Sequence, residues 1–390
     1  MRHPPLLALL LSSLITPLSA AELSGNISGE FRYFAEQPLD PQQHQNNSSI
    51  SAEIEWVKSW DRGYQLLVFS PYFRLDQGDS ERTHADIREL TWSKAADEWE
   101  LRLGIRQVFW GVSESQNLVD IINQTDLVDD IDGDEKLGQP MLNLAFIRDW
   151  GTVDLFLLPY FRERTFPGSE GRLRPALVID QDNPRYESSQ KQQHLDMALR
   201  WSHYFGDWDF GLSYFDGTNR DPDFVVNGSQ LQLYYRQIEQ FGLDIQATKE
   251  SWLWKLEAIH RRNHDSQYAA ATAGFEYSFY GIFERSADLG LVVEYLYDER
   301  GDSAPIAFQN DLMVGLRFTL NDEQSSEALL GAITDIESSS TVYSIEASRR
   351  LGDSWKATLE GRLFHNISPA DPLFHYRRDH FLQLRLGYYF

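Results

Sequence analysis

The stretch "LQLRLGYYF", Leu382 to Phe390, decides the fold class. Apolar side chains occupy every second position, and glutamine, arginine, glycine and tyrosine occupy the positions between them. Side chains alternate between the two faces of a β-strand, so this pattern predicts a strand with one apolar face and one polar face. An edge strand of a soluble sheet and a wall strand of a membrane barrel both fit it. The rest of the sequence separates the two.

The first 21 residues have the pattern of a secretory signal peptide. Arg2 precedes an apolar run from Leu6 to Leu18, and small residues follow at 19–21. This run is shorter than the stretch of about 20 residues that a helix needs to cross a bilayer. We therefore expect residues 1–21 to be removed on export and residues 22–390 to form the mature protein.

Composition favours a membrane barrel over a soluble fold. The chain has 390 residues, no cysteine and 13% aromatic residues, with a mean hydropathy of −0.44. The lack of cysteine excludes disulfides and thiolate metal sites. Low hydropathy with many aromatic residues is typical of barrels in which only alternate side chains face lipid. A large soluble β-sandwich or propeller is the competing class.

Period-two alternation recurs along the whole chain in segments of about ten residues, the length that a tilted strand needs to cross a bilayer. An even number of strands is needed for a closed antiparallel barrel with both termini on one side. Sixteen strands are the alternative to eighteen, because the parity is ambiguous at 84–94, 141–148 and 327–336. We expect strands at 23–34, 49–59, 64–76, 84–94, 99–110, 141–148, 152–163, 193–204, 208–217, 237–248, 252–261, 271–280, 288–298, 310–320, 327–336, 341–350, 355–365 and 379–390.

The connections between these segments point to an up-and-down barrel of the outer-membrane type. Short connections such as "DWG" at 149–151 and "FGD" at 205–207 alternate with longer polar ones. Short turns on one side and long loops on the other are the outer-membrane pattern, and a sandwich or propeller does not produce it. We expect the long extracellular loops to include 111–140, 164–192 and 218–236, and the C-terminal strand to close the barrel.

The polar face of each strand is expected to line the interior, because Arg or Lys on the lipid face costs about 2–4 kcal/mol at mid-depth. Two interpretations stay open: these side chains pair with one another and hydrate the wall, or they form a selectivity filter of opposed charges. Arg102 and Arg106 are the candidates for a basic stripe. The candidate pore-lining residues are Arg102, Arg106, Asp154, Asp196, Arg200, Glu257, Arg317, Glu360, Arg362 and Arg385.

The loop 111–140 mixes apolar residues with acids. Val119, Ile121 and Ile122 need a surface to pack on, which the loop finds either by folding back into the barrel or by forming a small cap. In the first case it narrows the channel. The candidate constriction residues are Asp120, Asp126, Asp129, Asp130 and Lys136.

No metal, cofactor or catalytic residue is predicted. The run "DIDGDE" at 130–135 lacks the glycine and glutamate of a helix–loop–helix calcium loop, which would fall at Glu135 and Met141. We expect a solvated acidic loop near lipopolysaccharide instead. "HADIR" at 84–88 and "HLDMALR" at 194–200 place histidine near carboxylate, but no serine is positioned by spacing to complete a triad. Rim residues that bond across strands fit them as well.

The formal net charge of −24 argues against a nucleic-acid partner, because like charges repel. The expected partners are the lipid and lipopolysaccharide of the outer membrane, the machinery that assembles barrels, and further copies of the chain by analogy with porins. The chain is not predicted to be an enzyme.

Three stretches carry a family resemblance: "LRLGIRQVFWG" at 101–111, "NLVDIINQTD" at 117–126 and "KLGQPM" at 136–141. They resemble uncharacterised proteobacterial outer-membrane barrels of the porin and alginate-exporter type, in which a Gly-x-x-Gln strand precedes a long loop. The resemblance implies a barrel in the outer membrane and transport across it. Alginate exporters have an arginine-lined pore, whereas inward acids are at least as numerous as bases here, which argues against export of a polyanion.

The last strand also resembles the C-terminal signal of outer-membrane proteins, with Tyr388 and Phe390 as the residues that the assembly machinery reads. The combined prediction is a channel for diffusion or selective uptake of small polar or charged solutes. The alternatives are an outer-membrane component of a lipid or polysaccharide export pathway, and a plugged barrel with binding or hydrolytic surface loops.

Overall fold

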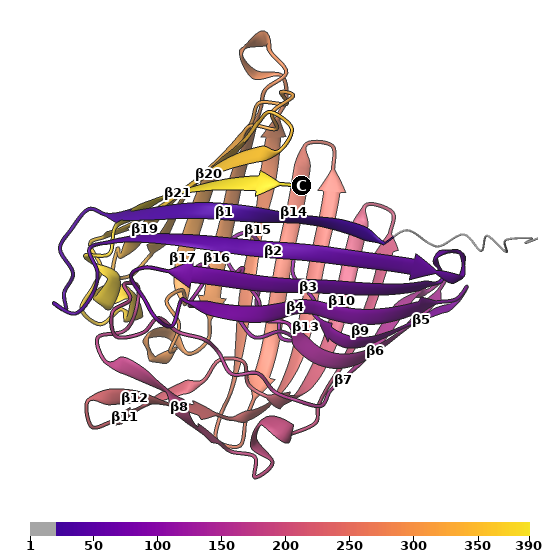
Figure 1. Ribbon diagram of the computed structural model, residues 1–390, viewed down its shortest axis with the longest axis horizontal. Coiled ribbons are helices and arrows are strands. Elements are labelled where there is room, and N and C mark those ends of the chain that lie inside the picture. The colour runs from indigo at the N-terminus through magenta and orange to yellow at the C-terminus, as the bar shows by residue number, and fades with distance from the viewer. Residues whose placement is uncertain (1–20) are drawn as a thin grey trace, which may run out of the picture.

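The computed structural model describes residues 21–390, so the predicted signal peptide lies, apart from Ala21, outside the described residues. Eighteen antiparallel strands form one closed barrel (Figure 1). The last strand, β21 (Phe381–Tyr389), pairs with the first, β1 (Glu22–Phe34). Phe390 and Gly25 extend this seam by exchanging two backbone hydrogen bonds of 3.1 Å. The predicted up-and-down barrel, closed by the C-terminal strand, is confirmed, with eighteen strands rather than sixteen.

Each wall strand pairs with the wall strand that follows it along the chain. Three further strands lie outside the wall. The wall continues from β1 through β2 (Asn46–Trp60), β3 (Gln65–Asp76), β4 (His84–Ala95), β5 (Trp99–Arg106), β6 (Gln139–Arg148), β7 (Gly151–Leu158), β9 (Asp196–Phe205), β10 (Trp208–Thr218), β13 (Gln237–Lys249), β14 (Trp252–Arg262), β15 (Gln267–Phe279), β16 (Asp288–Asp298), β17 (Asn310–Thr319), β18 (Glu327–Asp335), β19 (Thr341–Leu351) and β20 (Trp355–His365) to β21.

Two wall strands are shorter than the alternation predicts. The strand expected at 152–163 ends at Leu158, because Pro159 has no N–H to donate to the ladder. The strand expected at 99–110 ends at Arg106, two residues after Gly104, whose φ of +134° disfavours any other residue. Beyond both points the chain leaves the wall. The apolar and polar residues still alternate there, but the alternation no longer indicates which side chains face the interior.

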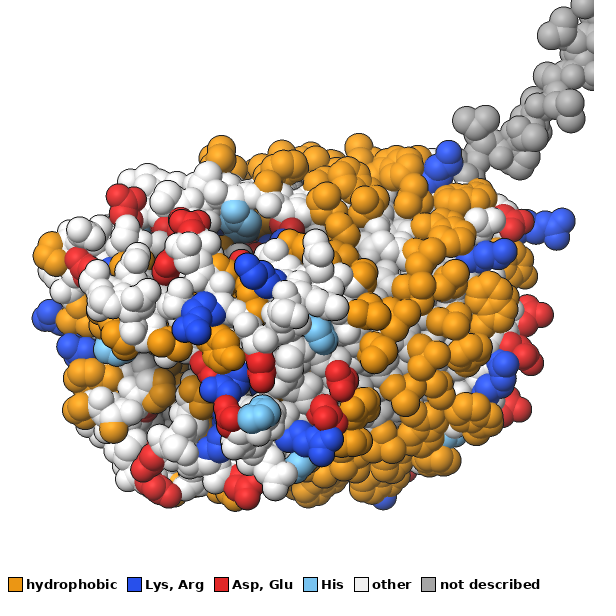
Figure 2. All heavy atoms as spheres, turned by 90° about the horizontal axis from the view of Figure 1, so that it is seen from below, with side chains coloured by type: hydrophobic (Ala, Val, Ile, Leu, Met, Phe, Trp, Pro, Cys, Tyr) orange, Lys and Arg blue, Asp and Glu red, His pale blue; other side chains and the backbone are white. Residues whose placement is uncertain are grey.

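The outer surface carries a broad apolar belt over the half of the barrel nearer the short turns (Figure 2). Side chains such as Leu199, Leu316 and Leu384 point outward and are 42–53% exposed. Aromatic residues gather beside the short turns, where Trp355 packs on Tyr388 at 5.1 Å between ring centroids. An apolar belt edged by aromatic residues is the outer surface that a bilayer requires of a barrel.

The two ends of the barrel differ in their connections. One end has turns such as 149–150, 206–207 and 250–251, and the other end has the long segments 107–138 and 159–195. Length alone does not sort every connection, since 280–287 lies at the short-turn end and is longer than 263–266 at the other. The predicted division into a short-turn end and a long-loop end therefore holds for most connections.

A second, three-stranded sheet, which the sequence pattern did not predict, lies at the long-loop end. It consists of β8 (Val178–Tyr186), β11 (Asp223–Asn227) and β12 (Gln230–Tyr235), with β12 pairing in parallel with β8. Its strands come from two different connections, and Leu233 and Tyr235 are almost fully buried against Phe161. The two connections therefore form one packed unit rather than separate loops.

Within residues 21–390 the helical segments are short pieces of 3₁₀-helix, of three to five residues. They are η1 (Asp61–Gly63), η2 (Lys191–Gln193), η3 (Ile282–Glu284), η4 (Gly301–Ser303) and η5 (Pro372–Tyr376). Between residues 21 and 390 there is no helix with the length and apolar character needed to span a bilayer.

Candidate functional site: the loop inside the barrel

The connection between β5 and β6, residues 107–138 (the inner loop), lies inside the barrel. Val119 and Ile122 have no exposed surface, and they pack with Phe156 of β7 and Ile259 of β14. Both a lumenal position and a surface cap fit the sequence. The structure places the loop inside, because its apolar side chains cover an apolar part of the inner wall.

Two buried glutamates of the wall hold the first half of the inner loop through its backbone. Glu257 of β14 accepts hydrogen bonds from the N–H groups of Val112 at 2.7 Å, Ser113 at 2.9 Å and Val119 at 3.2 Å. Glu294 of β16 accepts from the N–H groups of Glu114 and Ser115, at 2.8 and 2.9 Å. Hydrogen bonds to a charged acceptor contribute about 1.5–3 kcal/mol each, so these two carboxylates fix the path of the chain.

The inner loop reaches the wall opposite its own origin. Glu114 accepts a hydrogen bond of 2.6 Å from Arg317 of β17. Strand β17 is the ninth neighbour of β5 in the ring of eighteen, so the two strands face each other across the barrel. The loop therefore crosses the full width of the interior and narrows it.

The second half of the inner loop meets arginines of the wall. Every side chain in the three pairs below is at most 7% exposed. Breaking such a buried pair by removing one partner costs about 3–5 kcal/mol, because the other charge is left uncompensated. The pairs are Arg32–Asp130 at 3.1 Å, Arg74–Asp129 at 2.6 Å and Arg88–Asp126 at 2.9 Å.

Asp126 keeps its charge although it is buried. Burial acts to raise the pKa of its carboxyl, but the His84 ring, 3.5 Å away, and the charge of Arg88 outweigh burial and hold this pKa at about 2. Thr165 donates a further hydrogen bond of 2.6 Å. Asp126 is therefore ionised throughout the physiological range and ties the inner loop to β4 and to the neighbouring connection.

The two other predicted constriction residues pair with each other within the loop. The Lys136 Nζ atom lies 3.5 Å from a carboxylate oxygen of Asp120. Burial raises the pKa of Asp120 to about 6, although the charge of Lys136 opposes this shift. This pair joins the middle of the loop to its C-terminal part rather than facing open space.

Arg102 and Arg106 lie on the inner face of β5, as the parity predicts. Both donate to the side-chain oxygen of Asn143 on β6, at 2.8 and 2.9 Å. Arg102 also pairs with Glu100 and lies 3.8 Å from Asp154. They form a basic pair that acids of neighbouring strands partly neutralise, and a role in selectivity stays a prediction.

The other predicted lining residues in this half of the wall are engaged by partners. Arg200 forms a two-pronged ion pair with Asp244, with hydrogen bonds of 2.7 and 2.8 Å. Asp196 has no exposed surface and accepts from Arg220 at 2.6 Å and from Thr218. Asp196 and Glu257 thus lie on the inner wall, but the chain that packs over them separates them from solvent.

On the side of β17 to β21 the inner loop stands away from the wall and leaves a cavity of about 350 Å³. Eight carboxylates and three cationic side chains line it. The carboxylates are those of Glu114, Asp130, Asp132, Asp134, Glu135, Glu327, Glu346 and Glu360, and the cations are Arg317, Lys356 and Arg385.

This cavity corrects one expectation. The run "DIDGDE" was expected to be a solvated loop near lipopolysaccharide, but Asp132, Asp134 and Glu135 line the interior of the barrel. They lie there because the preceding carboxylates pair with arginines of the inner wall. Burial, followed by the charge of Asp129, raises the pKa of Glu135 to about 7.

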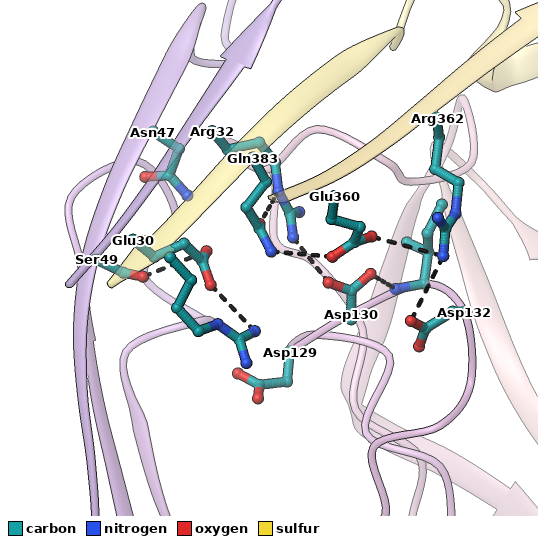
Figure 3. Close-up of polar contacts among 12 residues, drawn as sticks. Glu30, Arg32, Asn47, Ser49, Asp129, Asp130, Asp132, Glu360, Arg362 and Gln383 are labelled. Atoms are coloured by element: carbon teal, nitrogen blue, oxygen red, sulfur yellow. Dashed lines mark hydrogen bonds and ion pairs between the residues drawn. The ribbon is translucent and has the colours of Figure 1, made fainter. Parts of the chain in front are cut away.

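Three predicted lining residues meet at the rim of this cavity. Figure 3 shows Glu360 and Arg362 reaching from the wall toward the inner loop. Arg362 pairs with Glu346 at 2.8 Å, and Arg385 lies 3.4 Å from Glu30 on the other side of the seam. The structure therefore brings these residues to the same space as the acids of the inner loop.

Sequence reasoning did not single out Arg74 or Arg82. Arg74 has the parity of Tyr72 and Asp76 and the opposite parity to Phe73 and Leu75. The alternation within "YFRLD" could therefore have predicted that Arg74 points into the barrel. Arg82 lies in the connection 77–83, where no periodicity applies. It donates to the backbone carbonyls of Val128 and Asp129 at 3.2 and 2.9 Å.

The two histidine motifs form no triad. The Nδ1 atom of His194 lies 2.8 Å from Asp196, and the Nε2 atom of His84 lies 3.5 Å from Asp126. Within residues 21–390 neither ring has a serine hydroxyl among its hydrogen-bond partners. Both rings bond across neighbouring segments near the long-loop end of the barrel.

Comparison with known proteins finds no matching family model and no matching curated protein. Among solved structures the chain is similar to a mutant of the Rh. blastica porin, with 11% identity over 95% of this chain and 100% of that one, and a TM-score of 0.46. It is also similar to outer-membrane expressed OmpT of Vibrio cholerae, with 8% identity over 95% and 97% of the two chains and a TM-score of 0.44. At this level of likeness the architecture rests on the strand pairing of the chain itself.

Proposed function

We propose that this protein is an outer-membrane channel that passes small polar solutes and prefers cations. The observation that carries the proposal is the cavity beside the inner loop, where eight carboxylates face three cationic side chains. A narrow, water-filled passage lined by one sign of charge favours counter-ions. The inner loop sets the size limit, and the unbalanced carboxylates set the charge preference.

The outer surface supports the membrane location. The apolar belt of Figure 2 covers the strands near the short turns, and charged side chains lie beyond it on both sides. A soluble protein rarely exposes contiguous apolar patches larger than a few hundred Å². A closed barrel has no unpaired strand edge, so its backbone groups are satisfied within a bilayer.

The size of the barrel supports a channel. Small barrels of about eight strands are filled by their own side chains, whereas barrels of 16–18 strands enclose an aqueous space. Here the wall has eighteen strands, and the inner loop fills only part of the interior. A solute that passes through this space then meets the polar face of the wall and the carboxylates of the loop.

The test is single-channel conductance of the refolded barrel in a planar bilayer under a KCl gradient, with and without residues 113–138. We expect stable openings, a reversal potential that shows K⁺ passing more readily than Cl⁻, and larger openings after the deletion. If neither variant conducts although both are folded, the channel proposal is wrong. An anion preference would contradict the assignment of the acidic cavity as the filter.

The other predictions have their own readouts. An export component would stay closed until a periplasmic protein docks on the short turns, and hydrolytic loops would lose activity on substitution of His84 or His194. The roles of Tyr388 and Phe390 in assembly, and the association with lipopolysaccharide and with further copies of the chain, stay predictions. Both aromatic side chains lie on the outer surface at 40% and 49% exposure; Tyr388 packs on Trp355, and Phe390 stacks on Tyr388.

A further inference from the structure

Three carboxylates converge where the inner loop approaches β20. Asp130 and Asp132 belong to the loop and Glu360 belongs to the wall, and each offers an oxygen within 4.8 Å of the other two. Oxygens that bind one calcium ion at about 2.3–2.6 Å lie up to about 5 Å apart, when they sit on opposite sides of it. The three groups are therefore close enough to share one ion.

At this point one carboxylate oxygen of Glu360 has no hydrogen-bond donor among residues 21–390. The residue is buried on the inner wall at 9% exposure, and its side chain points toward Asp130 (Figure 3). Its Oε2 atom accepts a hydrogen bond of 3.1 Å from Gln383, whereas its Oε1 atom is buried and accepts none. Burying a charged oxygen without a donor lowers the stability of the fold, and a bound cation would remove this penalty.

The nearby arginines do not donate a hydrogen bond to this oxygen of Glu360. Arg362 lies 3.6 Å from Glu360 and 3.7 Å from Asp132, beyond hydrogen-bond distance, and its close partner is Glu346 at 2.8 Å. Arg32 donates to Asp130 at 3.1 Å, and its Nε atom donates to the amide oxygen of Gln383 at 2.7 Å, so it donates to neither Glu360 nor Asp132. Four carboxylates thus face two guanidinium groups, and the local charge stays negative.

The acids also act on one another. Burial, followed by the charges of Asp130 and Asp134, raises the pKa of Asp132 to about 7. Neighbouring carboxylates disfavour ionisation in this way when no cation lies between them.

We propose that Asp130, Asp132 and Glu360 bind a divalent cation, Ca²⁺ in preference to Mg²⁺, which bridges the inner loop to β20. The donors are all carboxylate oxygens, which suit hard cations. The ligands come from a loop and a strand rather than from one regular motif, and Ca²⁺ accepts such irregular geometry whereas Mg²⁺ demands a near-ideal octahedron. The sequence template failed because it looks for all ligands within one contiguous loop.

The experiment is calcium titration by calorimetry on the full-length mature barrel, refolded without lipopolysaccharide and stripped with EDTA. We expect one saturable Ca²⁺ site, with weaker Mg²⁺ binding. In Glu360→Gln the affinity falls about tenfold or more, since a ligand carboxylate is lost. Glu327→Gln is the matched control, because it removes the same charge from the same cavity outside the cluster, and it leaves the affinity unchanged.

A second variant keeps the test independent of any folding defect in Glu360→Gln. In Arg362→Gln the competing cation is gone, so Ca²⁺ binds several-fold more tightly; circular dichroism verifies the barrel in each case. The proposal is overturned if the parent protein shows no saturable site, or if Glu327→Gln weakens binding as much as Glu360→Gln does. Because calorimetry needs no conductance, failure here and failure of the channel proposal are distinguishable.

Discussion

The inner loop meets two sides of the barrel in different ways. Toward β1, β3 and β4, the loop carboxylates Asp126, Asp129 and Asp130 each have an arginine within 3.1 Å. Toward β17 to β21, carboxylates of loop and wall outnumber the cations around a cavity of about 350 Å³. We call these the matched side and the unmatched side. On the matched side the ion pairs hold the loop against the wall. On the unmatched side the cavity is open, and its excess of carboxylates creates a negative electrostatic potential that acts on a solute.

The largest effect is expected from breaking the matched side with Arg74→Met. This substitution leaves Glu30 and Asp129 buried without their shared partner, so we expect a loss of about 3–5 kcal/mol in the free energy of unfolding. Urea unfolding of the lipid-embedded barrel measures the change. The control is Arg349→Met, because Arg349 pairs with Asp322 at 48% exposure and such surface pairs contribute about 0–1 kcal/mol. Equal losses in the two variants would show that burial does not distinguish the pairs.

A smaller effect is expected from loosening the first half of the loop with Glu257→Gln. The side chain keeps its shape but loses the charge that accepts three backbone hydrogen bonds. We expect a loss of about 1.5–3 kcal/mol and noisier channel openings, since the loop gains freedom to move. Urea unfolding and single-channel recording measure these two effects. Quiet openings at unchanged stability would show that other contacts hold this half of the loop.

The unmatched side is expected to affect selectivity and not stability. In the double variant Glu327→Gln/Asp134→Asn, two of the eight carboxylates of the cavity become neutral. We expect a lower ratio of cation to anion permeability, from the reversal potential, with stability within about 0.5 kcal/mol of the parent. Asp182→Asn/Glu323→Gln removes two exposed charges outside the cavity and is the control. An equal change in the control would assign the preference to the overall charge of the protein.

The smallest effect is a dependence of selectivity on pH. The pKa values of Asp132 and Glu135 are both raised to about 7, with burial as the first cause. Both acids are charged above this pH and neutral below it, so cation preference falls as the pH is lowered from about 8 to about 6. The reversal potential in EDTA at the two pH values measures the change. It should flatten in Asp132→Asn/Glu135→Gln, and a parent protein without pH dependence would contradict the prediction.

The wall of the barrel was predictable from the sequence because alternation is a local property. Leu384 and Arg385 differ in parity, and the side of the wall on which each lies follows from this difference alone. The small sheet was missed because β11 and β12 have only five and six residues and lie within polar connections. Their pairing with β8 depends on chain that approaches from another connection.

The position of the inner loop was not predictable in the same way. Alternation shows that Arg317 points inward, but it does not show that Glu114 will lie 2.6 Å from it across the barrel. The arginine partners of Asp129 and Asp130 come from strands far away in the sequence. Residue types restricted the loop to a few environments, and only the three-dimensional arrangement of the wall selected one of them.

The seam between β1 and β21 has a consequence for the order of assembly. On its inner face Arg32 and Arg385 come together beside Arg74, and Glu30 is the acid of the wall that pairs with two of these three. Asp129 and Asp130 of the inner loop supply the missing negative charge. Closing the barrel between the most distant parts of the chain thus gathers wall arginines whose charge the inner loop balances. We therefore expect the seating of the loop to stabilise the closed seam, and the closed seam to stabilise the seated loop.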